Sequence, residues 1–442
     1  MSMWASRRKS QSTLRATTGD PHAELVVSRC AALEGGGELQ LLVTGTATVR
    51  TLMLLENNPF HRDRRVLREA RALTAAGHRV VVISPGEGRR FSRSHIDGAS
   101  VYQYPSSFAT GSWIGFVLEY VWAMAATFAI SVVASIRDGF DVIHAHNPPD
   151  VFFLIAWFHK AFGKSFVFDH HDLTPEMYEA KFGESKLVRR LLLICERLTF
   201  RASDHVISTN ESYREIAIGR GRVAPEHVTV VRNGPDLGQI RASLSEVVAA
   251  DSNETVIAYA GEMSDHDGVD YLLDALAALV FELGHADVRA LIIGDGDAVP
   301  ALKAKTADLG LVNHVRFTGW MRHDELMRLL ATADIGVEPC PSNAYNDRSS
   351  MIKLTEYMAL GKPIVAFDLP EHRRTAGDAA LYARANDPED MARQIEALIN
   401  EPERRRRLGE LGQQRIELLD WASQEPHLLK VYASLSTRSE HH

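Results

Sequence analysis

Residues 166–176 of this 442-residue chain, FVFDHHDLTPE, end an apolar run in four consecutive titratable side chains. The run Phe166–Phe168 predicts a buried strand, and Asp169, His170, His171 and Asp172 follow at its carboxyl end. These residue types are compatible with a metal site, an acid–base site or a polar strand end. Because strand side chains alternate between faces, His170 and His171 point apart and make a poor metal pair.

A second histidine pair stands in the stretch DVIHAHNPPD, residues 141–150. The spacing of His144 and His146 places both rings on one side of a strand. A metal ion would need further ligands, and the sequence has no H-E-x-x-H motif or aspartate-rich loop to supply them. We therefore expect no metal.

The stretch NDRSSMIKLTEYMALGKP, residues 346–363, predicts a short helix over about 350–360. Ser349 is a favourable N-cap residue, and Gly361 followed by Pro363 is a stop signal. Free amides and the helix dipole make such an amino terminus a natural seat for an anion.

Charged residues on and beside this predicted helix strengthen the anion hypothesis. Arg348 and Lys353 add positive charge at its tip, and Glu356 shares a face with Lys353. A phosphate at the tip with a carboxylate behind it suggests a nucleotide whose ribose binds Glu356. The alternative is a capped surface helix with an internal ion pair.

Two loops after predicted strands are further candidates. Gly294 opens the sequence GDG, which lets backbone approach a ligand closely. The stretch 56–66, ENNPFHRDRRV, carries polar and cationic side chains after the first strand.

The elements that must position these residues alternate between strands and helices. In the first half, strands are predicted at 50–56, 78–85, 140–146, 165–171, 204–209 and 228–234. In the second half, they are predicted at 255–262, 288–296, 314–320, 333–339 and 363–368. The pattern predicts an α/β protein with two doubly wound Rossmann-like domains facing a central cleft, where ligands bind at the carboxyl ends of the strands.

Composition shifts suggest boundaries between these parts. We expect a disordered extension over 1–47, a first domain over 48–235, a linker over 236–253 and a second domain over 254–404. The last helices, within 405–442, would cross back onto the first domain, with Trp421 packed at the crossing.

Overall composition narrows the class of protein. A net charge of −8 and a pI near 6.2 argue against nucleic-acid binding. Three separated cysteines exclude a disulfide framework and favour the cytoplasm. The first 20 residues lack the apolar core of a secretory signal.

One uncharged apolar segment, residues 120–136, is borderline in length for a membrane span. It lies between strands predicted for one sheet, and a span would place these on opposite sides of a bilayer. We expect a buried helix, with a face resting on a membrane surface as the alternative.

Taken together, these stretches resemble the family-4 glycosyltransferases, retaining enzymes with the GT-B fold. The resemblance covers residues from about 50 to 433. Within the family, the sequence is most similar to bacterial members that assemble cell-surface polysaccharides. The motifs that carry it are DVIHAHNPPD, FVFDHHDLTPE, VVRNGPD, GVDYLLDAL, IIGDG, VRFTGW and KLTEYMALGKPIVAFDLPE.

The resemblance implies transfer of a sugar from a nucleotide-diphosphate donor, without a metal, to an acceptor that is plausibly a lipid-linked glycan. His171 and Glu356 would be catalytic. The donor would be bound in the second domain by Gly294, Arg348, Ser349, Ser350, Met351, Lys353 and Glu356. The acceptor would be bound mainly in the first domain by Asn58, Arg62, Asp63, Asn147, Asp172 and Glu176. Such an enzyme would be cytoplasmic, or peripheral on the inner face of the cell membrane.

The sequence departs from the family's pattern at two places. The first glutamate of the family's E-x7-E motif is Arg348 here. The family's diphosphate-gripping Arg and Lys are Glu262 and Asp267. Either the charge clamp has been rearranged or catalysis has been lost, and the alternatives are a non-catalytic binder of sugar nucleotides or glycans, and a nucleotide-sugar epimerase. The sugar, the base, the linkage and the oligomeric state stay open.

Overall fold

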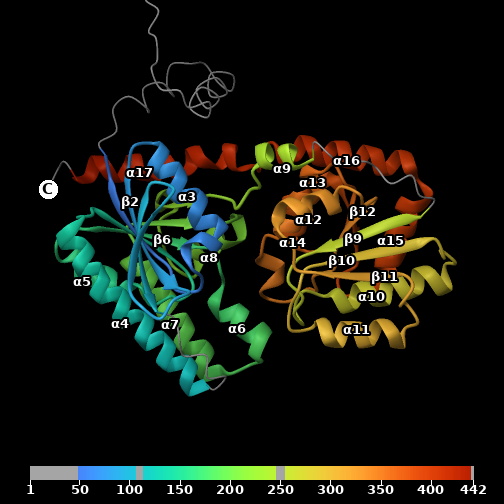
Figure 1. Ribbon diagram of the computed structural model, residues 1–442, viewed down its shortest axis with the longest axis horizontal. Coiled ribbons are helices and arrows are strands. Elements are labelled where there is room, and N and C mark those ends of the chain that lie inside the picture. Colours follow the sequence, from blue (N-terminus) through green and yellow to red (C-terminus); the bar gives the residue numbers. More distant parts are fainter. Residues whose placement is uncertain (1–47, 106–112, 245–253, 440–442) are drawn as a thin grey trace, which may run out of the picture. The chain divides into compact units, whose positions relative to one another are not determined.

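The computed structural model describes residues 48–105, 113–244 and 254–439. Within these ranges the chain forms two β-sheets, each covered by helices on both faces (Figure 1). The predicted α/β class with two Rossmann-like domains is confirmed.

The first sheet has the strand order β3-β4-β2-β1-β5-β6-β7-β8. All neighbours are parallel except the edge pair β3 and β4, and Thr51 of β1 is level with Val80 of β2 and Val142 of β5. Its strands are β1 (Arg50–Leu54), β2 (Arg79–Gly86), β3 (Ser92–Ile96), β4 (Ala99–Pro105), β5 (Val142–His146), β6 (Ser165–His170), β7 (His205–Ser208) and β8 (Val228–Val230).

Helices cover both faces of this sheet because its strands are apolar on both sides. Leu52 faces a core shared with α4, α5 and α7, whereas Met53 faces a core shared with α3 and α17. The helices of this half are α3 (Arg64–Ala75), α4 (Trp113–Arg137), α5 (Phe153–Lys160), α6 (Thr174–Phe182), α7 (Lys186–Ala202) and α8 (Glu211–Gly219), with 3₁₀ turns η1 (Phe60–Arg62) and η2 (Pro225–His227).

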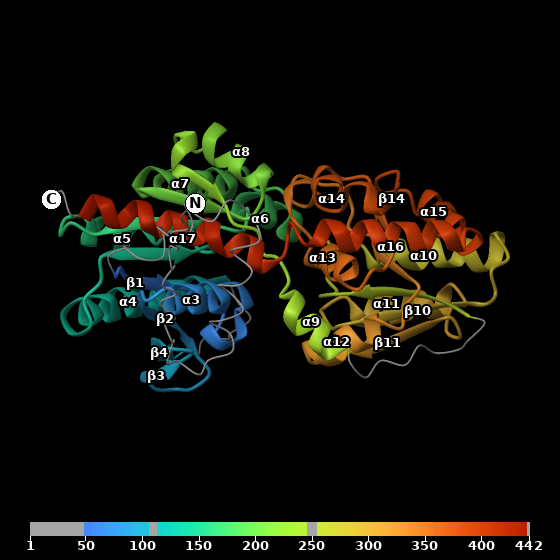
Figure 2. The ribbon, with the colours of Figure 1, turned by 90° about the horizontal axis from the view of Figure 1, so that it is seen from above.

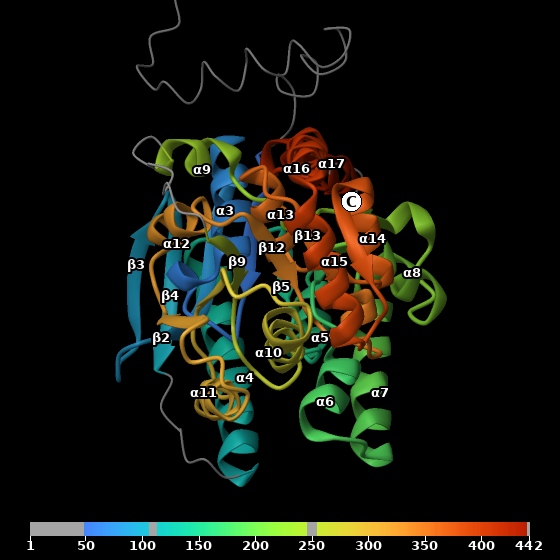
Figure 3. The ribbon, with the colours of Figure 1, turned by 90° about the vertical axis from the view of Figure 1, so that its right-hand side faces the viewer.

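The second sheet has the order β11-β10-β9-β12-β13-β14, and all its neighbouring strands are parallel. Figure 3 shows α10 and α11 on one side of it and α12 and α13 on the other. The strands are β9 (Thr255–Ala260), β10 (Val288–Ile293), β11 (Val315–Gly319), β12 (Ile335–Glu338), β13 (Ile364–Phe367) and β14 (Ala380–Ala383).

Helices and turns of the second half follow its strands in alternation. They are α10 (Val269–Ala277) with its π-helical continuation η3 (Ala278–Glu282), α11 (Val299–Asp308), α12 (His323–Leu330), η4 (Asn346–Arg348), α13 (Ile352–Ala359), α14 (Pro370–Ala376), η5 (Gly377–Ala379) and α15 (Pro388–Asn400).

Two long helices end the described chain, α16 (Pro402–Ile416) and α17 (Trp421–Ser439). Figure 2 shows α16 beside the second half and α17 beside the first. Leu428, Val431 and Tyr432 of α17 are buried in the core that contains Met53 and α3, and Trp421 packs against the same core, as expected. Gly234 allows this crossing, because a Cβ there would lie 1.9 Å from the Leu419 carbonyl oxygen.

The segment expected to be a linker, 236–253, contains a helix. Asp236 caps α9 (Leu237–Ser243) by accepting a hydrogen bond from the Gln239 amide. Leu237 and Ile240 are buried in a core of the second sheet, so the purely linker interpretation of this part was wrong. Residues 245–253, and the extension over 1–47, lie outside the described residues.

Helix α4 differs from the buried helix expected over 120–136. The stretch Leu118–Arg137 is long and apolar enough to cross a membrane by length and composition, yet only 28% of its most apolar part is buried. One stripe, including Ala123 and Ala126, packs on the sheet, while the opposite stripe is exposed. As expected from topology, β4 and β5, which flank α4 in the sequence, belong to one sheet.

Candidate active site

A cavity of about 570 Å³ lies at the carboxyl ends of the strands of both sheets. Its walls come from the loops after β1, β6, β7 and β8 in the first half, and after β9 and β12 in the second. Such an edge is where α/β proteins bind ligands. The lining residues are Asn57, Asn58, Arg62, Asp63, Arg64, Arg65, His171, Asp172, Thr209, Tyr213, Arg232, Asn233, Gly234, Glu262, His266, Asp267, Cys340, Tyr345, Asn346, Ser349, Ser350, Met351, Ile352, Thr355, Thr375 and Leu419.

Eight of the sequence-predicted site residues line this cavity. They come from the predicted acceptor loop, from the strand end that contains the histidine pair, and from the predicted anion seat. They are Asn58, Arg62, Asp63, His171, Asp172, Ser349, Ser350 and Met351.

The start of α13 supplies the anion seat in a form that differs from the prediction. The N-cap position is Met351 rather than Ser349, and no side chain caps the helix. Ser349 instead donates to the Tyr345 carbonyl at 2.9 Å and lies 3.1 Å from the Tyr213 hydroxyl. The Ser349 N-cap prediction was therefore wrong. The Leu354 amide donates to the Met351 carbonyl at 3.2 Å, but no side chain caps the helix, and such an amino terminus can still meet an anion.

Lys353 is removed from the cavity wall by its own ion network. Its Nζ lies 2.9 Å from the Tyr259 hydroxyl, 3.5 Å from Glu338 Oε1 and 3.8 Å from Asp267 Oδ1. Burial opposes its charge, but Glu338, Tyr259 and Asp267 outweigh burial and raise the pKa of Lys353 well above its usual value. The ammonium therefore neutralises buried carboxylates and does not line the cavity.

Glu356 also lies behind the wall, with 9% of its side chain exposed. Burial raises its pKa to about 7, although the charges of Arg64 and Arg68 oppose this shift. His323 lies 3.7 Å away, and burial and the same two arginines lower its pKa to about 4. Between pH 4 and pH 7 both groups are therefore mainly neutral, and the pair is not an ion pair.

Three further predicted ligands do not line the cavity. Arg348 is exposed and donates to the Ala344 carbonyl at 2.7 Å. Glu176 accepts hydrogen bonds from Arg220. Gly294, at φ +132°, packs against Gly261, since a Cβ would lie 1.9 Å from the Gly261 oxygen. Its role is loop packing in the second half.

Asn147 is fully buried and shapes the strand end from behind. Its Oδ1 accepts the backbone amides of His171 and Asp172, at 2.8 and 3.0 Å. Its Nδ2 donates to Asp150 at 3.0 Å and to the Asp172 carbonyl at 2.7 Å. It fixes the two residues that reach the cavity and does not itself line the wall.

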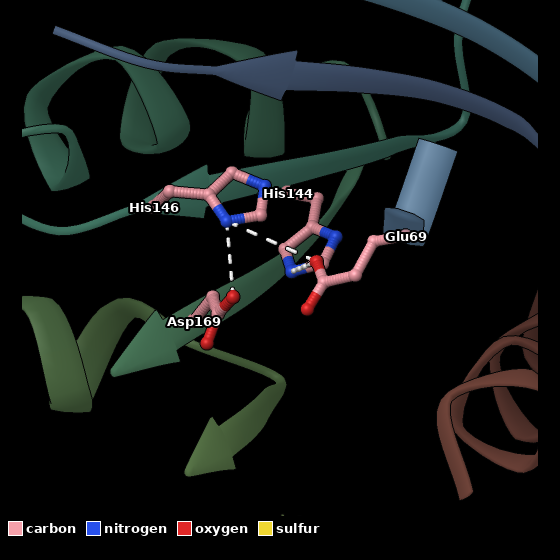
Figure 4. Close-up of side chains that lie close together, drawn as sticks. All are labelled: Glu69, His144, His146 and Asp169. Carbon is pink, nitrogen blue, oxygen red and sulfur yellow. Dashed lines mark hydrogen bonds and ion pairs between the residues drawn. The ribbon is translucent and has the colours of Figure 1, made fainter. Parts of the chain in front are cut away.

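A buried cluster lies beneath His171, made of Glu69, His144, His146 and Asp169 (Figure 4). His146 Nδ1 is 3.0 Å from Asp169 Oδ2, and His144 Nε2 is 3.9 Å from Glu69 Oε2. The two histidines share one side of β5, as the spacing predicted. No sequence motif indicated further ligands, but α3 and β6 bring the carboxylates of Glu69 and Asp169 beside the two histidines.

Arg65 supplies the positive charge that balances the carboxylates of this cluster. Its Nε and Nη2 donate to both oxygens of Asp169 at 2.7 and 2.9 Å, and Nη2 lies 3.1 Å from Glu69. A bidentate guanidinium already supplies the positive charge that a cation would bring. The residues therefore fit a self-compensated ion network better than a metal site, and the absence of a metal stays a prediction.

Two family models match the chain. A "Glycosyl transferase 4-like domain" matches residues 63–234, and "Glycosyl transferases group 1" matches residues 254–401. The chain belongs to the family-4 type of GT-B glycosyltransferases.

Relatives in this family include the D-inositol 3-phosphate glycosyltransferase of Corynebacterium kroppenstedtii, 26% identical over 56% of this chain and 57% of that protein. The chain thus spans under two thirds of that relative. The Corynebacterium efficiens enzyme of the same name is 24% identical over 74% of this chain and 80% of its own. The mannosyltransferase "MMP alpha-(1->4)-mannosyltransferase" of Mycolicibacterium hassiacum is 26% identical over 70% and 74%.

Solved structures with the same fold include sucrose-phosphate synthase from Thermosynechococcus elongatus. It has a TM-score of 0.70 and 17% identity, and covers 88% of this chain and 100% of its own. HepE of Anabaena, in a structure with UDP-glucose, has a TM-score of 0.66 and 17% identity, and covers 87% and 100%. At these identities the likeness shows the GT-B fold alone.

The loop that departs from the family's pattern lines the cavity with Glu262 and Asp267. Asp267 accepts hydrogen bonds from the Ser264 amide and hydroxyl, at 3.0 and 2.5 Å, and faces Lys353. The negative charge of Asp267 is thus partly compensated by groups inside the protein.

Sequence reasoning missed one cation that lines the cavity, Arg232, which follows β8. Among the cavity-lining arginines of the described chain, Arg62 pairs with Glu87, Arg64 contacts His323 and Arg65 pairs with Asp169, whereas no side-chain hydrogen bond or ion pair engages Arg232. It is half-buried, and burial lowers its pKa. The available signal was a charged residue at a strand's carboxyl end in VVRNG.

Proposed function

We propose that this protein is a retaining glycosyltransferase that moves a sugar from a nucleotide-diphosphate donor to a glycan acceptor in bacterial surface polysaccharide synthesis. The observation that carries the proposal is the cavity between the uncapped start of α13 and the polar strand end at His171. Membership of the family supports the reaction class.

The diphosphate would bind where the amides after Ser349 and Ser350, in the second half, meet the guanidinium of Arg232, which follows β8 of the first half. Free helix amides and one unpaired cation are suited to charge that grows on a departing diphosphate. A charge contact near 4 Å contributes roughly 4 kcal/mol at an effective dielectric near 20, which explains how Arg232 can replace the lost clamp cations. No metal is needed for this charge balance.

The acceptor would bind in the first half, along Asn58, Arg62 and Asp63. His171 would lie by the anomeric carbon, between donor and acceptor. Retention follows if the acceptor oxygen attacks from the side on which the leaving phosphate departs, so that a phosphate oxygen takes the acceptor's proton. In that path the protein stabilises the leaving group and orients the sugar.

The test is a transfer assay with a panel of labelled nucleotide sugars and a membrane extract. Arg232→Gln should lower kcat/KM about a hundredfold, since one donor to a developing charge is typically worth that much. The matched control is Arg348→Gln, which removes an exposed arginine outside the cavity and should change little. Equal effects of the two variants would remove Arg232 from the site.

A non-catalytic binder is the second candidate, because Glu262 and Asp267 place negative charge in the cavity wall. The same assay separates the candidates. Labelled product in the lipid or glycan fraction supports transfer, a changed nucleotide sugar without acceptor indicates an epimerase, and calorimetric binding without turnover indicates the binder.

An apolar surface on the first half is relevant to the chemical nature of the acceptor and to where the protein is located in the cell. The α4–α5–α7 surface consists of Leu118, Val121, Phe128, Val133, Ile136, Leu154, Trp157, Phe158, Phe162, Leu187, Leu191 and Ile194, all exposed. The ring centroids of Phe128 and Phe158 lie 5.1 Å apart, which joins α4 to α5. The three helices lie on one side of the first sheet (Figure 1).

We propose that the α4–α5–α7 surface rests on the cytoplasmic membrane and that the acceptor is lipid-linked. On α7, exposed Lys186, Arg190 and Arg197 accompany the apolar side chains, a combination that suits an anionic bilayer. Sedimentation with phosphatidylglycerol vesicles should retain the protein, and Leu187→Ser/Leu191→Ser should weaken retention at least about tenfold. Trp320→Ser, an exposed aromatic of the second half, is the control.

A further inference from the structure

The carboxylate of Asp169 is held from two sides at the carboxyl end of β6. Arg65 of α3 donates to both of its oxygens, and His146 Nδ1 of β5 lies 3.0 Å from Oδ2. Asp169 is fully buried, and Arg65 and His146 are 5% and 2% exposed. Two other elements, α3 and β5, therefore converge on one carboxylate of β6 and leave it little freedom.

His171 follows two residues later and connects this carboxylate to the cavity. Its Nδ1 is buried and lies 3.7 Å from Asp169 Oδ2, while its backbone amide is held by Asn147 at 2.8 Å. The ring lines the cavity with 14% of the side chain exposed. With Nδ1 turned inward, Nε2 is the ring nitrogen available to a ligand.

We propose that Asp169, clamped by Arg65 and His146, is a positioning residue that holds His171 as an imidazolium whose Nε2 faces the leaving diphosphate. This inference rests on the proposed glycosyl transfer. It names a group of the first half that would stabilise the negative charge on the leaving diphosphate. The imidazolium adds one positive charge on the first-half side of the cavity, which also carries Arg232, whereas the α13 tip belongs to the second half. It exchanges no proton with the reactants.

The charge count in the cluster supports this assignment. Glu69 and Asp169 share one guanidinium, and burial raises the pKa of Glu69 well above its usual value, which favours its neutral form. Burial opposes ionisation of Asp169, but Arg65, His146 and His171 outweigh it and hold its pKa well below the usual range. Asp169 is then balanced by Arg65, and the carboxylate that faces His171 at the cavity wall is Asp172.

The groups that face His171 act in both directions. Burial and the charge of Arg65 lower its pKa, whereas Asp169 and Asp172 raise it, and the net shift is upward. His146 of β5, with ring centroids 6.1 Å apart, has its own pKa lowered by burial and is neutral. The upward shift favours the charged form of His171, whereas the downward shift favours the neutral form of His146.

The experiment is a histidine NMR titration of the full chain, with His171 assigned by its loss in His171→Gln. In wild type, His171 should titrate above its ordinary value of about 6.5. Asp169→Asn should lower that pKa by at least about one unit, because it removes the facing charge and keeps the shape. Glu69→Gln should shift it by less than about 0.3 unit, because the raised pKa of Glu69 favours the neutral form that glutamine mimics.

Activity supplies a second readout. Asp169→Asn should lower kcat about a hundredfold with donor KM within about threefold, and should shift the alkaline limb of the pH–rate profile to lower pH. Asp141→Asn, which breaks the remote Arg50–Asp141 pair, should change neither the pKa nor the profile. A structural role alone would not move the His171 titration.

The proposal is overturned if wild-type His171 titrates below about 6.5, if Asp169→Asn leaves the His171 pKa in place, or if Glu69→Gln moves it as far as Asp169→Asn does. Should Asp169→Asn not fold, the wild-type and Glu69→Gln titrations still decide the matter. Wild type without transferase activity would defeat the proposed function, while the titration would still test the Asp169–His171 pairing.

Discussion

Each half of the molecule buries one cation among carboxylates at the carboxyl edge of its sheet, but the halves differ in what remains for a ligand. In the first, Arg65 neutralises Asp169, and His171 still reaches the cavity. In the second, Lys353 is enclosed by Glu338 and Asp267, and what reaches the cavity is the uncapped start of α13. A cation near a site can therefore bind a ligand only if buried carboxylates do not already neutralise its charge.

The largest effect that tests this comparison concerns Lys353. Lys353→Met would leave the fully buried Glu338 without its counter-charge, and breaking such a pair costs about 3–5 kcal/mol. We expect a matching loss of unfolding free energy in urea. Lys353→Met/Glu338→Gln should recover much of it. If Lys353→Met unfolds like wild type but loses donor affinity, Lys353 is a ligand after all and the two halves are alike.

Glu356 should give a somewhat smaller, pH-dependent effect. Its folded pKa of about 7 is above the unfolded value of 4.5, so its contribution to stability is fully present below pH 4.5 and is lost as the pH rises through 7. Glu356→Gln mimics the protonated form. The variant should match wild type near pH 4.5 and exceed it by about 3 kcal/mol above pH 8.

Thermal unfolding across pH measures this difference. Curves that run parallel at all pH values would show that Glu356 ionises normally and is therefore close to solvent or to a cation.

The sequence was sufficient for the fold and for much of the cavity because both depend on local pattern. Apolar runs that end in polar residues marked the strand ends, and these brought His171 and Ser350 to one cavity. What failed depends on contacts distant in sequence. Helical spacing placed Lys353 beside Glu356, but only the folded chain shows that Glu338 and Asp267 enclose its ammonium. Arg232 was overlooked because its lack of a partner is visible only in three dimensions.

The prediction that the helix over 120–136 is buried failed for a related reason. An uncharged segment of 17 residues is compatible with burial on all sides, and nothing in its composition reveals how many neighbours cover it. The structure supplies a sheet on one side and leaves Val121 and Ile136 exposed on the other.

The smallest effect concerns Asn210, which links the two halves. Its Oδ1 caps α8 by accepting from the Tyr213 amide at 2.8 Å, and its Nδ2 donates to the Arg348 carbonyl and to Ser350 Oγ at 2.8 and 3.0 Å. The first half thereby positions the loop that leads into α13. Asn210→Ala should cost about 1 kcal/mol for the cap alone.

Asn210→Ser separates the cap from the link, because serine caps a helix well but is too short to replace both donations. We expect Asn210→Ser to regain most of the unfolding free energy lost in Asn210→Ala, while donor KM stays about fivefold above wild type, the value of roughly one hydrogen bond. Unchanged KM in both variants would mean that the α13 tip is placed by the second half alone. The two halves would then differ in the charge that they offer a ligand, and the first half would not position the α13 tip.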